Sequence, residues 1–74
     1  MAKIIEKVYS TKRIKKTNSI VKRLLIIKAC KGYYHGIVKI WHDVEKNYVF
    51  LCSAKFYEKD GDMTEHRVKE YFNF

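Results

Sequence analysis

The fold is decided in the middle of the chain, where two strand-forming runs flank a polar segment. The runs are Gly36-Ile37-Val38-Lys39-Ile40-Trp41-His42 and Tyr48-Val49-Phe50-Leu51-Cys52-Ser53-Ala54-Lys55-Phe56-Tyr57. Both are rich in β-branched and aromatic residues, which favour the pleated backbone of a strand. The polar residues from Asp43 to Asn47 are typical of the loop that joins such strands. The sequence therefore predicts an antiparallel hairpin here.

Toward the N-terminus the pattern allows more than one structure. Residues 19–31 contain the apolar run Leu24-Leu25-Ile26-Ile27 between charged residues, which fits a buried strand. Lys31-Gly32 would then be a two-residue hairpin turn, with glycine supplying a positive φ. A helix capped by Ser19 is the alternative, but it would point its basic side chains to widely different sides, so we favour a strand. Residues 3–15 fit a strand and a helix equally well.

After the hairpin, the chain shows the signals of a turn and then a helix. Asp60-Gly61 predicts the turn, and Asp62 with Glu65 three residues on is a capping-box arrangement. We expect a helix from Met63 to about Phe72, which would bury Val68, Tyr71 and Phe72. Residues 1–74 are then one α+β domain: a small antiparallel β-meander of three to four strands with a C-terminal α-helix.

Positive charge is concentrated in the first part of the chain. The 74 residues include 16 Lys and Arg against 8 Asp and Glu, a formal net charge of +8. Residues 1–31 hold ten of the basic residues and one acid, Glu6, and so carry +9, whereas residues 32–74 carry −1. Such a patch repels itself, and nucleic-acid phosphates relieve the repulsion because their neutralisation releases condensed counterions. The distribution predicts RNA or DNA as the partner. An acidic protein surface and a face that serves solubility alone are the alternatives.

Two groups of residues are candidates for nucleic-acid contact. The first is the basic N-terminal region. The second is the hairpin, where Lys39 shares a strand face with Trp41 and Lys55 with Tyr57, so that cations alternate with rings able to stack on bases. Burial of these two rings in the core is the competing interpretation. The predicted binding residues are Lys12, Arg13, Lys15, Lys16, Lys22, Arg23, Lys39, Trp41, Lys55 and Tyr57.

The hairpin also resembles the opening of a cold-shock domain. Residues 36–42 align with that family's G-x-V-K-W-F-N segment, and residues 46–51 align with its K-G-Y-G-F-I segment. Asn47 and Val49 replace the two glycines of the second segment, and Ile40 replaces the tryptophan of the first. The resemblance is confined to residues 36–51. It implies an RNA-binding strand pair with Tyr48 and Phe50 in the binding motif.

Metal and catalytic signatures are weak. Cys30, His35, His42 and Cys52 lack the spacing of zinc ligands, which are usually paired two to four residues apart. The histidines, arginines and tyrosines are residue types that small ribonucleases use, but no Ser/His/Asp order, glycine-rich phosphate loop or paired carboxylates accompany them. We predict no metal, no cofactor and no catalytic residue. A small ribonuclease toxin stays an alternative.

The sequence as a whole predicts a small basic nucleic-acid-binding accessory protein that acts by binding. A phage- or mobile-element-type inhibitor, directed at a host protein that processes nucleic acid, is the alternative. The charged residues near the N-terminus argue against a signal peptide, and the longest apolar run falls far short of the roughly 20 residues that span a bilayer. We expect a cytoplasmic protein (in the host cytoplasm if viral) with no membrane partner. DNA versus RNA and the oligomeric state are left open.

Overall fold

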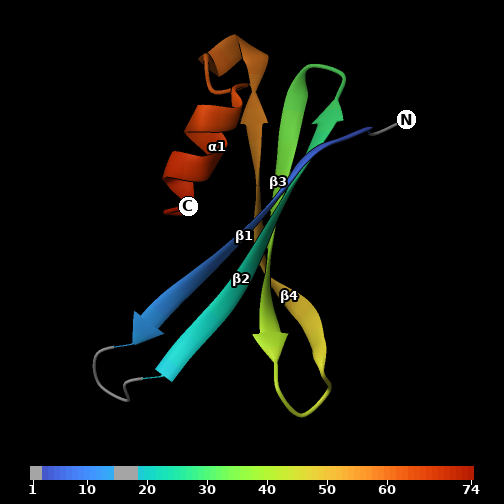
Figure 1. The fold of residues 1–74 in the computed structure, drawn as a ribbon. Coiled ribbons are helices and arrows are strands. Elements are labelled where there is room, and N and C mark those ends of the chain that lie inside the picture. Colours follow the sequence, from blue (N-terminus) through green and yellow to red (C-terminus); the bar gives the residue numbers. More distant parts are fainter. Residues whose placement is uncertain (1–2, 15–18) are drawn as a thin grey trace.

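The chain folds into one sheet with a helix packed against it. The computed structural model describes residues 3–14 and 19–74, with side chains placed for residues 7–13 and 20–74. The sheet contains β1 (Lys3–Ile14), β2 (Ser19–Cys30), β3 (Tyr33–His42) and β4 (Asn47–Tyr57), in that order. A 3-10 turn, η1 (Glu58–Asp60), then leads to α1 (Glu65–Tyr71) (Figure 1). All neighbouring strands are antiparallel. The predicted α+β meander with a C-terminal helix is confirmed.

Both segments that the sequence left ambiguous are strands. β1 and β2 pair along their length, with a register shift between Ile4 and Glu6. The strand suits the buried residues of β2 because Leu25 and Ile27, two residues apart, both pack beneath α1, as the period of two in a strand requires. Leu24, between charged and apolar neighbours on the opposite face, is also buried. Gly32, at φ +81°, forms the predicted turn with Lys31.

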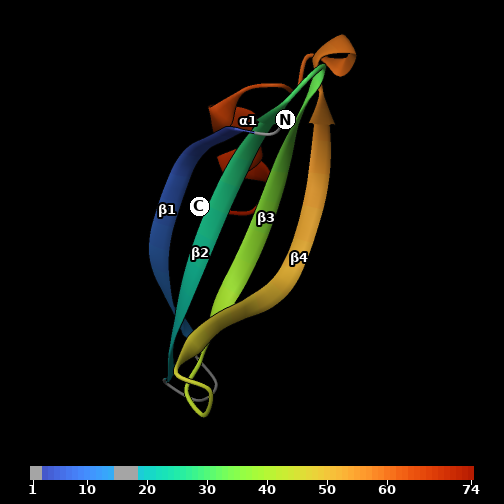
Figure 2. The same ribbon diagram turned by 90° about the vertical axis from the view of Figure 1, so that its right-hand side faces the viewer.

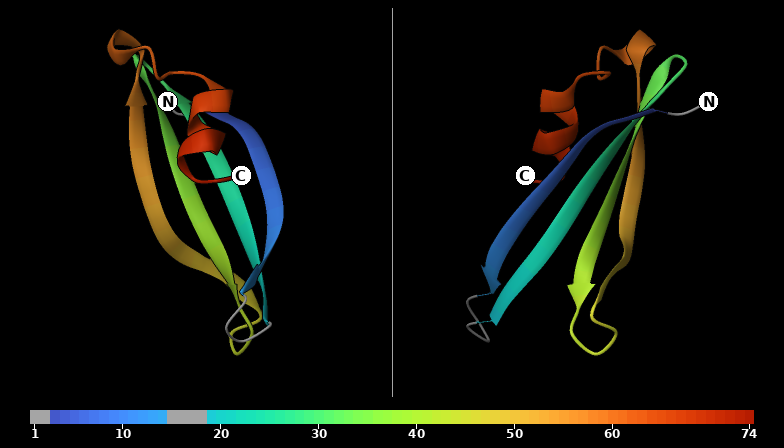
Figure 3. Two further views of the ribbon diagram at one scale, coloured as in Figure 1. Left: turned by 90° about the vertical axis from the view of Figure 1, so that its left-hand side faces the viewer. Right: turned by 45° about the vertical axis from the view of Figure 1, so that its right-hand side comes forward.

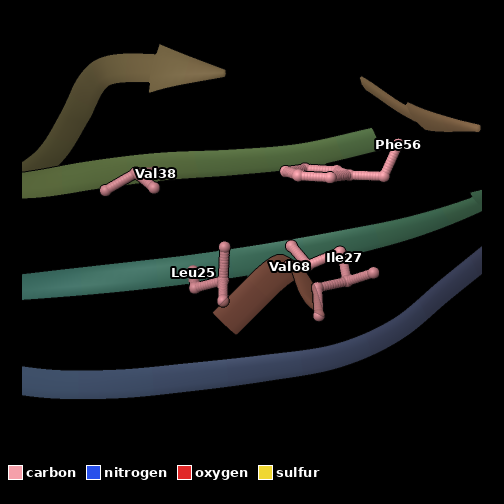
Figure 4. Packing of buried hydrophobic residues seen from close by; sticks show 5 residues of the cluster. All are labelled: Leu25, Ile27, Val38, Phe56 and Val68. Carbon is pink, nitrogen blue, oxygen red and sulfur yellow. The ribbon is translucent and has the colours of Figure 1, made fainter. Parts of the chain in front are cut away.

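The core lies between the sheet and α1, and five buried side chains form it (Figure 4): Leu25, Ile27, Val38, Phe56 and Val68. Gly36 in β3 has no side chain, so that α1 can pack close to this strand. A Cβ atom at Gly36 would lie 2.8 Å from Val68 Cγ1 and 2.8 Å from Phe72 Cε2. The helix therefore packs directly onto the backbone of β3 at this position.

The predicted start of the helix is wrong by two residues. Thr64 is the N-cap, and its Oγ1 accepts a hydrogen bond of 3.1 Å from the backbone N–H of Arg67. Asp62 lies two residues before this cap and outside the helix, and its backbone N–H is bonded to Tyr57 O. Its carboxylate instead accepts from Arg67 Nε at 3.0 Å. The expected burial of Tyr71 is also wrong, since this side chain is 64% exposed at the end of α1.

The sheet is coiled as well as twisted. From the side away from α1, β4 sweeps across one end of the sheet (Figure 2), and α1 covers only the other half of the opposite face (Figure 3). A register shift between Val38 and Lys39 marks a bulge in the β3–β4 pairing, and bulges increase local bending. Among the described residues, no helix is long and apolar enough to cross a membrane.

Candidate nucleic-acid interface

The face of the sheet away from α1, here called the open face, follows from the strand register. Paired residues of neighbouring strands point to the same side of a sheet. Three rows therefore cross the open face: Lys7, Ile26, Ile37 and Ser53; Tyr9, Leu24, Lys39 and Phe50; and Lys28, His35 and Lys55. The rows place apolar, aromatic and basic groups side by side.

The open face is basic and carries no described acid. Its cationic side chains are Lys7, Arg13, Lys22, Lys28, Lys39 and Lys55. No side chain that the structure places in a strand is an aspartate or glutamate. Of the described acids, Glu6 lies in β1 at a position that pairs with Ile27, outside the open-face rows, and the others lie in the β3–β4 loop or after residue 57. The lysines and arginine of these strands therefore make the open face attractive to anions, and the nearest described carboxylate is that of Asp43 in the β3–β4 loop, which is bonded to Trp41 Nε1.

One end of the open face carries four side chains, here called the Tyr9 cluster: Tyr9, Lys22, Trp41 and Tyr48. The ring centroids of Tyr9 and Tyr48 are 5.9 Å apart, and those of Trp41 and Tyr48 are 5.2 Å apart. Lys22 Nζ lies 5.9 Å from the Trp41 ring centroid. Nearby in the same face, Leu24 is only 8% exposed, whereas Tyr9 is 64% exposed. The cluster thus combines a cation with accessible ring surface.

Trp41 is held in place within the Tyr9 cluster. Its indole Nε1 donates a hydrogen bond of 2.9 Å to Asp43 Oδ1, and its ring meets Tyr48 edge to face. The side chain is half-buried. These two contacts hold the indole ring of Trp41 in a fixed orientation against the ring of Tyr48.

The other end of the open face carries a second group of rings and cations. The centroids of Tyr33 and Tyr57 are 5.7 Å apart, and Lys55 Nζ lies 5.2 Å from the Tyr33 ring. A hydrogen bond with the Cys30 side chain and the charge that Cys30 can carry raise the pKa of Tyr33 above its ordinary value. About 27 Å of β3 separates this group from Trp41, at about 3.4 Å per residue.

The predicted binding residues divide between the two faces. On the open face lie Arg13, Lys22, Lys39, Trp41, Lys55 and Tyr57. Lys39 and Trp41 occupy the half with the Tyr9 cluster, whereas Lys55 and Tyr57 occupy the other half. Lys12 alternates with Arg13 and so points to the opposite side. Lys15 and Lys16 lie outside the described residues.

Arg23 has a structural position on the face that α1 covers. Its Nη1 donates to Phe72 O at 3.1 Å and its Nη2 donates to Asn73 O at 2.8 Å. The guanidinium also lies 4.3 Å from the centroid of the Phe74 ring. Arg23 thus ties the end of the chain to β2, and we leave it and Lys12 out of the interface.

Sequence reasoning missed several residues of the open face, namely Lys7, Tyr9, Lys28 and Tyr33. Alternation along β1 would have placed Lys7 and Tyr9 together if that segment had been recognised as a strand. Tyr48 and Phe50 were indicated only by the resemblance to the cold-shock domain. Both lie on the open face, opposite Trp41 and Lys39.

The cysteines and histidines are divided by the strand register. Cys30 and His35 belong to the open face, whereas His42 and Cys52 belong to the opposite one. Among the described residues, no three His, Cys, Asp or Glu side chains are placed to hold a metal ion. The structure thus offers these groups no shared site.

Comparison of the chain with models of protein families, with curated proteins and with solved structures gives no match. Function is therefore inferred from the open face itself.

Proposed function

We propose that this chain is a nucleic-acid-binding protein that holds a phosphate backbone across the open face of its sheet and acts by binding. One observation carries the proposal. Six cationic side chains share this face, and no described Asp or Glu occupies a position in its strand rows. Phosphates are the partner that such a face fits, because each phosphate neutralised releases a condensed counterion.

The arrangement of the cations supports a bound polyanion. Lys28 and Lys55 stand on either side of His35 in one row of the open face. Lys28 in β2 and Lys55 in β4 are two strand spacings apart, about 10 Å, and like charges at this separation repel each other. A phosphate backbone lying along this row would remove the repulsion, so that binding and folding support each other. The rings at both ends of the face add flat surfaces on which bases stack.

The test is a binding titration at several salt concentrations. The probes are fluorescein-labelled single-stranded oligodeoxythymidine and oligouridine. On single strands, the log–log slope of affinity against salt should be about −0.7 for each phosphate contacted. If several lysines contact phosphates at once, the log–log slope of affinity against salt should be steeper than about −2. A flat salt response would contradict phosphate contact. The absorbance ratio of purified protein before and after a high-salt wash gives an independent check.

A second candidate function is binding to another protein through the outer edge of β4. β4 is an edge strand, and Phe50 and Leu51 are exposed on it within an uncharged stretch. Exposed edge strands can pair with an extended segment of a partner. A partner retained after a high-salt wash by the wild-type chain, but lost with Leu51→Lys, would favour this function.

A further inference from the structure

The Tyr9 cluster borders a pocket at one end of the open face. The pocket has a volume of about 250 Å³ and is lined by Tyr9, Ser10, Thr11, Lys22 and Tyr48. Its lining joins β1, β2 and the start of β4, three strands that a flat sheet would spread apart. The coiling of the sheet therefore creates this pocket.

The size of the pocket limits what can enter. Pockets for drug-sized ligands measure roughly 300–1,000 Å³, and this pocket is smaller. Its volume suits a single planar group. The tilt of 57° between the Tyr9 and Tyr48 rings leaves them unstacked on each other.

The chemistry of the lining matches a nucleobase. Two tyrosine rings offer flat apolar surfaces, and Tyr9 is largely exposed. Thr11 provides a hydroxyl that can donate or accept a hydrogen bond. Lys22 provides a cation that is suited to a base carbonyl or to the adjacent phosphate. A base paired within a duplex has both faces covered by its neighbours and cannot use these rings.

We propose that this pocket takes one unpaired base, so that the open face selects single-stranded over double-stranded nucleic acid. This inference rests on the proposed function, since the phosphate contacts bring the strand to the pocket. Tyr9 is the stacking platform. Tyr48 forms the second wall, and Trp41, bonded to Asp43 and packed against Tyr48, positions that wall.

The test compares Tyr9→Leu with Tyr9→Phe on two probes, a single-stranded oligonucleotide and the same sequence as a duplex. Leucine keeps an apolar side chain but removes the ring, whereas phenylalanine keeps the ring. Stacking on an aromatic side chain is worth about 1–3 kcal/mol per base, which is about 5- to 150-fold in affinity. We expect Tyr9→Leu to lose about that factor on the single strand and nothing on the duplex. Tyr9→Phe should bind both probes like the wild type.

A second measurement uses the wild-type protein and so does not depend on the folding of a variant. An oligonucleotide of abasic sites has the same phosphates but no bases. It should bind more weakly than the ordinary single strand by at least the factor lost in Tyr9→Leu. Two results would overturn the base pocket. The first is equal binding of the abasic and ordinary single strands, and the second is an equal loss of affinity for the single strand and the duplex with Tyr9→Leu. The proposed function would survive that result, because salt-dependent binding would remain. Absence of binding to all probes would overturn both.

Discussion

The ring of Tyr9 in β1 lies 5.9 Å from the ring of Tyr48 in β4, although two strands separate β1 from β4 in the sheet. Strands are spaced by about 4.8 Å, so that three spacings in a flat sheet would be about 14 Å. The two outer strands therefore converge over the open face. This convergence brings residues from opposite edges of the sheet into one cluster and makes a continuous surface of rings and lysines.

Lys22 and Arg23 are adjacent in the sequence but have different roles, which a matched pair of variants separates. Lys22→Gln should leave the unfolding free energy nearly unchanged and lower affinity for single-stranded oligonucleotides, since Lys22 is on the open face. Arg23→Gln should lower stability by about 1–3 kcal/mol, the value of hydrogen bonds from a charged donor. Each variant loses one charge. Urea unfolding and a binding titration measure both effects, and identical behaviour of the two variants would refute the assignment of faces.

Trp41 should contribute mainly to stability. Trp41→Ala removes a half-buried indole and its edge contact with Tyr48. We expect a loss of about 2–3 kcal/mol in unfolding free energy, below the roughly 3–5 kcal/mol of a fully buried aromatic. Trp41→Phe retains the ring contact but loses the bond to Asp43, so about 1 kcal/mol should be lost. An unchanged urea midpoint for Trp41→Ala would show instead that the indole is free on the surface.

Gly36 should be intolerant of a side chain while Val68 is present. Gly36→Ala places a Cβ atom 2.8 Å from Val68 Cγ1, and overpacking of this kind costs about 1–3 kcal/mol. Val68→Ala removes that contact atom at a cost of its own, while Phe72 Cε2, also 2.8 Å from the added Cβ, remains, so the relief is partial. The double variant should therefore be more stable than the sum of the two single effects predicts. Strict additivity in thermal or urea unfolding would contradict the contact.

Neutralising both Lys28 and Lys55 should change stability little. The double variant Lys28→Gln/Lys55→Gln should melt within a few degrees of the wild type, because the relief of repulsion between two charges about 10 Å apart offsets the loss of the contact between Lys55 Nζ and the Tyr33 ring. Its affinity for oligonucleotides should fall about tenfold or more through lost counterion release. A large fall in melting temperature would show that these lysines are structural.

The sequence predicted the strands best where local signals agreed. The β3–β4 hairpin and the Lys31-Gly32 turn follow from β-branched residues and a glycine, both of which act locally. β1 could not be assigned because Val8 and Tyr9 fit both periodicities. The helix cap was misplaced because Asp62 and Thr64 are both good capping residues. In the structure Thr64 Oγ1 accepts from the backbone N–H of Arg67, whereas the Asp62 carboxylate accepts from the Arg67 side chain.

The candidate site was only partly predictable for a related reason. Composition predicted the basic character of the site. Alternation along the hairpin strands predicted Lys39 and Lys55 as members of it. Arg23 looked like one more cation in a basic run, and only its contacts with the C-terminal carbonyls show its role. The meeting of Tyr9 and Tyr48 depends on how far the sheet coils, a property that no short stretch of sequence encodes.

The most direct test of the central claim compares two double variants that lose the same charge from opposite faces. Lys22→Gln/Lys39→Gln removes two cations from the open face. Lys12→Gln/Lys69→Gln removes one from the other face of β1 and one from α1. Both variants are titrated with single-stranded oligonucleotide at several salt concentrations. The log–log slope of affinity against salt should be shallower by about 1.4 for the open-face variant than for the wild type, which is about 0.7 for each lost phosphate contact. The control should keep the wild-type slope. Equal slopes for the two variants would contradict the assignment of nucleic-acid binding to the open face.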